Sequence, residues 1–255
     1  MFSAHGTRAI LFWSDPDNER IEPVTLSYLV DCSHIKPDKE ANLGNAKRRV
    51  VVVGAGGHAK VVLETLWAMN AFEVVGLTDP STAVLEVLGA PVLGGDELLP
   101  GLFAQGVTSA VVAIGSNRRR QQIGQSLLAL GFSLPVVVHP TALISPSATI
   151  NQGAVVLARA VVGTLASIGE LAIINTGAIV EHDNQIGQSA HIGPGVALAG
   201  GVQVGDRALV GIGSAVRPDI SIGDDSIVGA GSAVVANVPL GVTVAGVPAR
   251  IIPSR

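Results

Sequence analysis

The chain carries a hydrophobic residue at every sixth position from Ile144 to Val234 without one insertion, and this period is its most constraining feature. An amphipathic helix repeats every three to four residues and a half-buried strand every two, so neither explains a period of six. The sixteen positions are Ile144, Ile150, Val156, Val162, Ile168, Ile174, Val180, Ile186, Ile192, Leu198, Val204, Val210, Val216, Ile222, Val228 and Val234. None is aromatic, and small or slender residues, mostly alanine, stand two positions before them. The pattern predicts short strands stacked around a narrow core.

Composition restricts the class of protein. The 255 residues are 48% hydrophobic, which allows a substantial core, and the formal charge of -4 argues against nucleic acid or an anionic membrane as partner. The single cysteine, Cys32, excludes an internal disulfide and a cysteine zinc cluster. Apolar stretches are broken well short of a membrane span, and the run 9–13 is too short for a signal-peptide core. We expect a cytoplasmic protein without membrane insertion that acts on small molecules.

Three segments follow one another along the chain. Residues 1–48 fit no motif and are interpreted as an N-terminal extension of unknown role. In residues 49–139 apolar runs alternate with amphipathic stretches, which predicts a small Rossmann-like parallel sheet covered by helices. Residues 140–255 hold the repeat and a tail. The expected strands of the middle segment are 50–53, 73–78, 109–114 and 134–138, and its expected helices are 59–69, 96–103 and 118–130.

A glycine-rich turn follows the first expected strand. Gly54, Gly56 and Ala59 match the spacing G-x-G-x-x-A at the start of a helix, where bare backbone and helix N–H groups receive a phosphate. Asp79 follows the second strand, where an acidic residue binds ribose hydroxyls. The segment is only about one mononucleotide-binding half, which argues against a dinucleotide enzyme. The turn therefore favours an anionic ligand, and the alternative is that the glycines only make a tight turn.

These motifs resemble a known group of enzymes. The hexapeptide period is similar to that of the left-handed parallel β-helix acyltransferases, in which three hexapeptides form one triangular coil and most members use acyl-CoA. The segment 54–61, G-A-G-G-H-A-K-V, resembles the start of bacterial nucleotide-sugar acetyltransferases, which include sialic acid O-acetyltransferases and N-acetyltransferases of UDP-linked 4-amino-4,6-dideoxy sugars. The resemblance covers about residues 49–252. It implies an α/β domain followed by a left-handed parallel β-helix, with acetyl-CoA as cosubstrate and no metal.

The resemblance also assigns the nucleotide-sugar site to the N-terminal domain. One departure is Thr78-Asp79-Pro80, where some relatives have two consecutive acidic residues, so the base and the sugar stay open. The residues that would line the site are Gly56, Gly57, His58, Asp79, Gly115 and Asn117.

With eighteen residues per coil, His182 lies at a corner, two positions after Val180, and its side chain should point outward. Glu181 and Asp183 flank it, and a neighbouring carboxylate orients a histidine and stabilises its protonated form. One coil further on, Gly200 occupies the same corner and leaves a slot for an extended thioester arm. His182 is thus a candidate general base, and a merely solvated Glu-His-Asp corner is the alternative.

The resemblance gives these residues roles. His182 would deprotonate the sugar amine or hydroxyl, and Asp183 would raise its basicity. His191 would contact the acetyl-CoA thioester from the neighbouring chain, while Gly200 and Ile212 would hold the cofactor along the coil. Arg250 ends the segment 246–250, G-V-P-A-R, which resembles a terminal Gly-x-Pro-Ala-Lys motif with arginine in place of lysine.

The outward-facing residues predict the assembly. Sorting by face gives one polar and two apolar faces, and apolar faces on a soluble prism imply burial against partners. We expect a homotrimer with active sites at subunit interfaces and with His191 at such an interface. The polar face carries Thr149, Ser167, Gln185, Gln203 and Ser221; the apolar faces carry Leu143, Val161, Ile179, Ala197, Ala215 and Ala233, and Val155, Ile173, His191, Leu209 and Ile227.

The leading hypothesis is an acetyl-CoA-dependent N-acetyltransferase that acts on a nucleotide-linked amino sugar. O-acetylation of sialic acid or another sugar is the closest alternative, and a non-catalytic trimeric nucleotide-sugar-binding protein is the next. A β-helical carbonic anhydrase would need three histidines around zinc, and the coil holds only His182 and His191.

Overall fold

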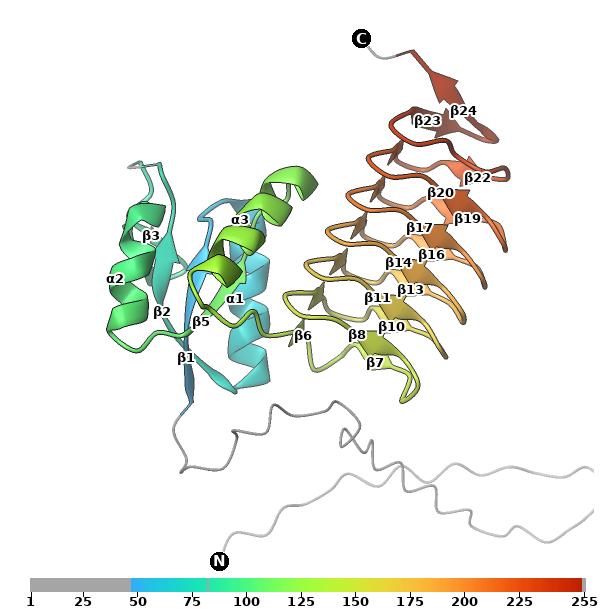
Figure 1. Ribbon diagram of the computed structural model, residues 1–255. Coiled ribbons are helices and arrows are strands. Elements are labelled where there is room, and N and C mark those ends of the chain that lie inside the picture. Colours follow the sequence, from blue (N-terminus) through green and yellow to red (C-terminus); the bar gives the residue numbers. More distant parts are fainter. Residues whose placement is uncertain (1–46, 82, 254–255) are drawn as a thin grey trace, which may run out of the picture. The chain divides into compact units, whose positions relative to one another are not determined.

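The computed structural model describes residues 47–81 and 83–253. The extension predicted for residues 1–48 falls almost wholly outside this part. In the described residues an α/β domain is followed by a β-helix whose triangular coils stack one above another (Figure 1). No helix of the described residues is both long and apolar enough to span a membrane.

The α/β domain is built on a five-stranded sheet in the order β3-β4-β2-β1-β5. All neighbouring strands are parallel except the antiparallel pair β3 and β4. Alternate valines of β1 point to opposite faces, so Val50 and Val52 pack with helix α1, and Val51 and Val53 pack on the side of helix α3. The strands are β1 (Arg48–Val53), β2 (Phe72–Thr78), β3 (Glu86–Val87), β4 (Ala90–Gly94) and β5 (Ser109–Val112); the helices are α1 (Gly57–Met69), the 3-10 turn η2 (Asp96–Leu98), α2 (Leu99–Ala104) and α3 (Asn117–Ala129).

The β-helix consists of three parallel sheets of mostly two-residue strands. We name them the domain-facing sheet, the open apolar sheet and the polar sheet. The domain-facing sheet contains β6 (Val137–Val138), β9 (Val155–Val156), β12 (Ile173–Ile174), β15 (His191–Ile192), β18 (Leu209–Val210), β21 (Ile227–Val228), β23 (Thr243–Gly246) and β24 (Ala249–Ile252), the last antiparallel. The open apolar sheet contains β7 (Leu143–Ile144), β10 (Val161–Val162), β13 (Ile179–Val180), β16 (Ala197–Leu198), β19 (Ala215–Val216) and β22 (Ala233–Val234). The polar sheet contains β8 (Thr149–Ile150), β11 (Ser167–Ile168), β14 (Gln185–Ile186), β17 (Gln203–Val204) and β20 (Ser221–Ile222).

The hexapeptide period is confirmed by the strand register. Ile173 pairs with His191 and Ile174 with Ile192, so each residue meets its equivalent eighteen positions later. The second residue of each strand points inward: Val180 and Ile192 are fully buried among the alanines that precede them. The core is therefore a narrow stack of small and branched side chains, as predicted.

The corners of the coil require left-handed backbone. Leu171, Asp183 and Ser189 have φ of 58°, 60° and 53°. Each lies where the chain turns from one sheet to the next, and this conformation is uncommon for residues other than glycine. The repeated left-handed corner residue turns the chain so that the next strand returns to the stack.

The two parts of the chain share apolar core. Val155, Leu157 and Ile173 of the β-helix belong to the same buried cluster as Leu63 and Leu66 of α1. Strand β6, which the sequence pattern assigns to the α/β domain, pairs with β9 in the domain-facing sheet. One expectation is wrong as a result: the face that carries Val155 and Ile173 is not open for another subunit along its whole length, because this chain's own α/β domain covers its first part.

Candidate active site

The corner after β13 holds the candidate base. His182 Nδ1 donates a hydrogen bond of 2.8 Å to the Asp183 carboxylate, and the histidine side chain is 62% exposed. This bond raises the pKa of His182, with smaller contributions from the charges of Asp183, Glu181 and Asp219. Because Nδ1 carries the proton toward Asp183, Nε2 of the neutral ring has a free lone pair. The corner thus presents an oriented, exposed proton acceptor.

Gly200 lies directly against the His182 ring. A Cβ atom at this position would overlap Cε1 and Nε2 of the imidazole, and a Cβ at Gly201 would overlap the Asp219 carboxylate. The sequence predicts an empty slot here, but in this structure the His182 ring occupies the space over Gly200. Gly200 therefore serves to let the imidazole lie close to the next coil.

His191 lies on the domain-facing sheet, beside this chain's own α/β domain. The Asn175 amide donates to His191 Nε2 at 3.0 Å, and its oxygen accepts from the Thr176 N–H at 2.8 Å. This pattern leaves the proton of the neutral ring on Nδ1. Burial first, then the charges of Arg120 and His58, lower the pKa of His191 to about 4. Within one chain His191 is thus half-buried beside the α/β domain, and its place at a subunit interface stays a prediction.

A cavity of about 330 Å³ opens where β1, β2 and β5 end. Five of the six residues predicted for nucleotide-sugar binding line it: Gly56, Gly57, His58, Asp79 and Gly115. The carboxyl ends of parallel strands and the N-terminus of α1 meet here, which is the usual ligand position in such sheets. The fold therefore brings three separate stretches of the chain together in one pocket.

The backbone around this pocket depends on Gly54 and Asp79. Gly54 has φ of 107°, and a Cβ there would lie 2.9 Å from the Ile114 side chain, so glycine is required. Asp79 accepts from the backbone N–H groups of Ala55 and Ser81, each at 2.8 Å. The carboxylate thus holds the glycine-rich turn as well as facing the cavity.

His58 lies in the wall of this pocket. Its Nε2 is buried and has no hydrogen-bond partner in the described structure, and burial together with the charge of Arg120 lowers its pKa to about 4. The charge of His58 also contributes to the lowered pKa of His191. His58 lines the pocket, whereas His191 is not among the lining residues.

Three predicted residues lie elsewhere. Asn117 does not line the pocket, because its amide donates to the carbonyls of Arg207 and Ala208 in the β-helix at 2.8 and 3.0 Å. Ile212 is 58% exposed at the corner after β18, at the opposite edge of the open apolar sheet from His182. Arg250 is exposed on β24, where it donates to its neighbour's carbonyl.

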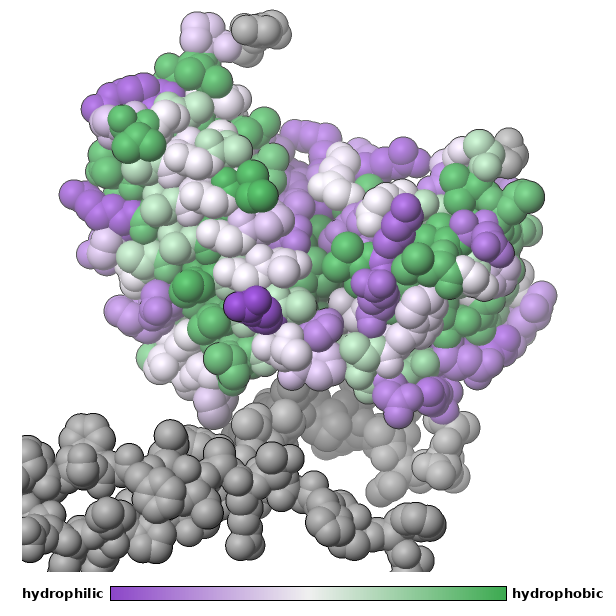
Figure 2. Space-filling view, turned by 180° about the vertical axis from the view of Figure 1, so that it is seen from behind, coloured by the Kyte–Doolittle hydropathy of each residue, from purple (hydrophilic) through white to green (hydrophobic). Residues whose placement is uncertain are grey.

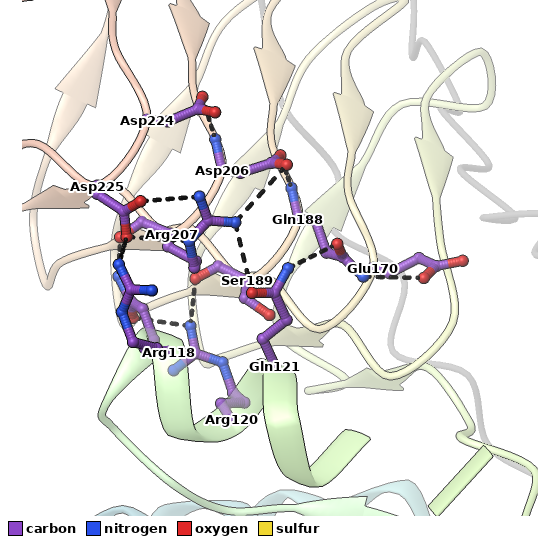
Figure 3. Close-up of polar contacts among 11 residues, drawn as sticks. Arg118, Arg120, Gln121, Glu170, Gln188, Ser189, Asp206, Arg207, Asp224 and Asp225 are labelled. Carbon is purple, nitrogen blue, oxygen red and sulfur yellow. Dashed lines mark hydrogen bonds and ion pairs between the residues drawn. The ribbon is translucent and has the colours of Figure 1, made fainter. Parts of the chain in front are cut away.

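Two charged pocket residues and the contact between helix α3 and the coils were not predicted from the sequence. Asp96 and Arg119 line the cavity, and Asp96 accepts from the Thr78 hydroxyl at 2.9 Å. Across the contact, Arg118 of α3 pairs with Asp225 at 2.8 Å, and the Gln121 amide donates to Gln188 at 2.8 Å (Figure 3). The place of Arg119 in the pocket could have been predicted, because α3 begins soon after β5 and helix N-termini at strand ends form such pockets.

The geometry defines a class. A nucleotide-sized pocket at the carboxyl edge of an α/β sheet, followed by a left-handed β-helix with an oriented corner histidine, is the arrangement of a hexapeptide-repeat acyltransferase. The described residues contain no group of three side chains that could hold a metal ion.

Comparison with known proteins identifies the family. The PglD N-terminal domain family matches residues 49–127. PerB from Caulobacter crescentus, solved in complex with CoA and GDP-perosamine, is 47% identical with a TM-score of 0.78, covering 84% of this chain and 100% of that chain. The acetyltransferase domain of PglB from Neisseria gonorrhoeae, solved with acetyl coenzyme A, is 40% identical with a TM-score of 0.78, covering 81% and 100%. The chain belongs to this family of hexapeptide-repeat nucleotide-sugar N-acetyltransferases.

A curated relative adds a further match. The UDP-N-acetylbacillosamine N-acetyltransferase of Bacillus subtilis (strain 168) is 39% identical over 119 residues, which are 43% of this chain. The match spans about half of that relative, 51% of its length.

Proposed function

We propose that this protein transfers the acetyl group of acetyl-CoA to the amino group of a nucleotide-linked amino sugar, of the 4-amino-4,6-dideoxy type, with His182 as general base. The observation that carries the proposal is the His182–Asp183 pair, whose 2.8 Å hydrogen bond leaves Nε2 free to accept a proton. The relatives named above are N-acetyltransferases, which favours an amine over a hydroxyl as acceptor.

The reaction needs no covalent acyl-enzyme. The neutral amine attacks the thioester carbonyl, a C–N bond forms, and His182 Nε2 takes the proton that the amine loses. When the tetrahedral intermediate collapses, the C–S bond breaks and the proton passes to the leaving sulfur of CoA. Asp183 stabilises the imidazolium that forms between these steps.

The other predicted residues receive binding roles. At Gly56 and Gly57 an added Cβ would have no protein atom within 4 Å, so a phosphate can approach their backbone at the start of α1. His58, Asp79 and Gly115 complete this nucleotide pocket, whereas Asn117 receives no binding role. For acetyl-CoA we propose His191, Gly200, Ile212 and Arg250, of which Ile212 and Arg250 are exposed.

We further propose a homotrimer in which copies pack through the open apolar sheet. Leu143 is 65% and Ile179 39% exposed on this sheet, and hydrophobic residues also reach the surface in the view of Figure 2. His182 lies at one edge of the sheet and Ile212 at the other, so a copy packed there would place the base beside a subunit interface. We infer a cytoplasmic location, where acetyl-CoA is available.

The test is an assay of the purified protein with acetyl-CoA and a matched panel of UDP- and GDP-linked sugars. Each amino sugar is paired with the sugar that carries a hydroxyl at the same carbon. We expect mass spectrometry to detect one added acetyl group on amino sugars only. Acetylated hydroxyl sugars would favour the O-acetyltransferase, and calorimetric binding without any product would favour the non-catalytic protein.

A further inference from the structure

Arg120 of helix α3 is fully buried, and every oxygen that accepts a hydrogen bond from it is uncharged. Its guanidinium has five N–H donors, which form bonds of 2.7 to 3.4 Å. They reach the α/β domain at Ile114 O, Gly115 O and Asn117 Oδ1, and the β-helix at Leu171 O, Ser189 O and Ala190 O. One side chain thus joins the wall of the nucleotide pocket to the coils.

The contacts on the β-helix follow its repeat. Leu171 and Ser189 are equivalent residues on successive coils, because the strands that follow them pair Ile173 with His191. Asn117, which accepts from Arg120, donates to Arg207 O, the equivalent position one coil further. The pair therefore holds three consecutive corners of the prism. Figure 3 shows Arg120 with two of the corner residues, Ser189 and Arg207, and the surrounding polar contacts.

The proposed catalytic residues lie on the coil between the first two corners. His182 and Asp183 lie between Leu171 and Ser189, and His191 follows Ala190 directly. On the other side, Gly115 lines the nucleotide pocket. Arg120 is consequently a direct hydrogen-bonded link between the two binding regions.

We propose that Arg120 is a positioning residue for acetyl transfer: it holds the wall of the nucleotide pocket in place relative to the coil that bears His182 and His191. This proposal rests on the proposed function. The sugar, held by its nucleotide, then reaches the catalytic prism in a constant position. A displacement of about 1 Å between reacting groups can lower the rate about a hundredfold.

Arg118 provides a matched control on the same helix. It also crosses to the β-helix, through Asp225 at 2.8 Å, but its side chain is 67% exposed and its ion pair lies away from the pocket carbonyls. If Arg120 only stabilised the contact between the two parts, loss of either arginine would act in the same way on the assembled protein.

The experiment compares Arg120→Lys, Arg120→Met and Arg118→Met in the full chain. In Arg120→Lys, which keeps the charge but cannot reach both sides, we expect kcat to fall about 10- to 100-fold, with KM for acetyl-CoA changed less than about twofold. Arg118→Met should keep kcat within about twofold. Arg120→Met removes the guanidinium donors from buried carbonyls, which can prevent folding. In that case the result for Arg120→Lys decides whether the proposal holds.

Two readouts need no catalysis and separate this proposal from the proposed function. Hydrogen exchange should increase together at residues 114–117 and 189–191 in Arg120→Lys but not in Arg118→Met. In folded Arg120→Met, NMR titration should find the pKa values of His58 and His191 raised, because a nearby positive charge is lost. A folded Arg120→Lys with normal kcat and unchanged exchange would overturn the proposal. A wild-type protein that acetylates no sugar would overturn the proposed function, and the exchange readout would still decide whether Arg120 holds the pocket wall to the coils.

Discussion

The β-helix and the α/β domain are specified by the sequence in different ways. In the β-helix, from β6 to β22, the strands of a sheet pair with those eighteen residues away, so a single short pattern defines register, core and corners. In the α/β domain Arg48 of β1 pairs with Phe72 of β2, and Val50 pairs with Ser109 of β5, at unrelated separations. A periodic region can therefore be described residue by residue from its sequence, while a non-periodic one yields its elements but not its contacts.

The two regions also hold different parts of the candidate active site. The proposed base, His182, is exposed on a corner of the prism, whereas the pocket lies at the strand ends of the α/β domain and is lined by His58, whose pKa is lowered. If this division holds, substitutions in one region should change one step of the reaction and leave the other intact.

The strongest test of the division removes the base. His182→Ala should lower kcat by roughly a hundredfold to ten-thousandfold, the usual contribution of a positioned general base. Binding of both substrates, followed by calorimetry, should be preserved, since the side chain is exposed and packs on no core. His139→Ala is the control, because His139 is bonded through its ring to neighbouring Thr141. A near-normal kcat in His182→Ala would remove the residue from the mechanism.

The second test compares a substitution on the domain-facing sheet, which the α/β domain partly covers, with one on the open apolar sheet. Ile173→Asp places a carboxylate in the core shared with α1, and the free energy of unfolding should fall by about 3–5 kcal/mol. Ile179→Asp lies on the open apolar sheet, so it should dissociate the proposed trimer with little loss of subunit stability. Urea denaturation and light scattering measure the two effects, with Gln185→Glu on the polar sheet as control. A trimer that survives Ile179→Asp would exclude this sheet as the interface.

The third test compares two glycines, one in each region. Gly200→Val should displace the His182 ring that lies over it, and kcat should fall about 10- to 100-fold. A Cβ at Gly57 has no protein atom within 4 Å, so Gly57→Val should narrow the pocket, raise KM for the sugar about tenfold and spare acetyl-CoA binding. Steady-state kinetics and calorimetry of each ligand give the answer. Loss of acetyl-CoA binding alone in Gly57→Val would contradict the assignment of sites.

The smallest effect concerns Asp183. Its hydrogen bond raises the pKa of His182, and the base works only when neutral, so activity is lost as pH falls through that pKa. Asp183→Asn removes the carboxylate, lowers the pKa of His182 and should move the acidic limb of the pH–rate profile to lower pH. The maximal rate should fall less than about tenfold. An unchanged limb would leave Asp183 with a structural role only.

Short sequence patterns predict much of the fold and of the pocket. All sixteen hexapeptide positions lie on strands of the prism, and the glycine-rich turn leads into a helix beside a pocket. Five of the six predicted nucleotide-site residues line that pocket, because strand ends and helix starts can be located from local hydrophobicity and glycine spacing.

The contact between the two regions could not be predicted in this way. Arg120 is the last of three consecutive arginines, and nothing in the order Arg118-Arg119-Arg120 distinguishes the buried one from the exposed ones. Its partners in the β-helix lie 51 to 70 residues away, and those of Asn117 lie 90 and 91 away. For the same reason the covered part of the domain-facing sheet looks like an open apolar face in the sequence.

The three corners held by Arg120 and Asn117 restrict where the prism can gain or lose a coil. Adjacent strands of a sheet lie about 4.8 Å apart, so a coil inserted between Leu171 and Arg207 would move these corners apart by about that distance. The hydrogen bonds from Arg120 and Asn117 could not then all be made. Coils beyond Arg207 carry no such restraint from these two side chains, so the prism can change its length at that end without disturbing this contact.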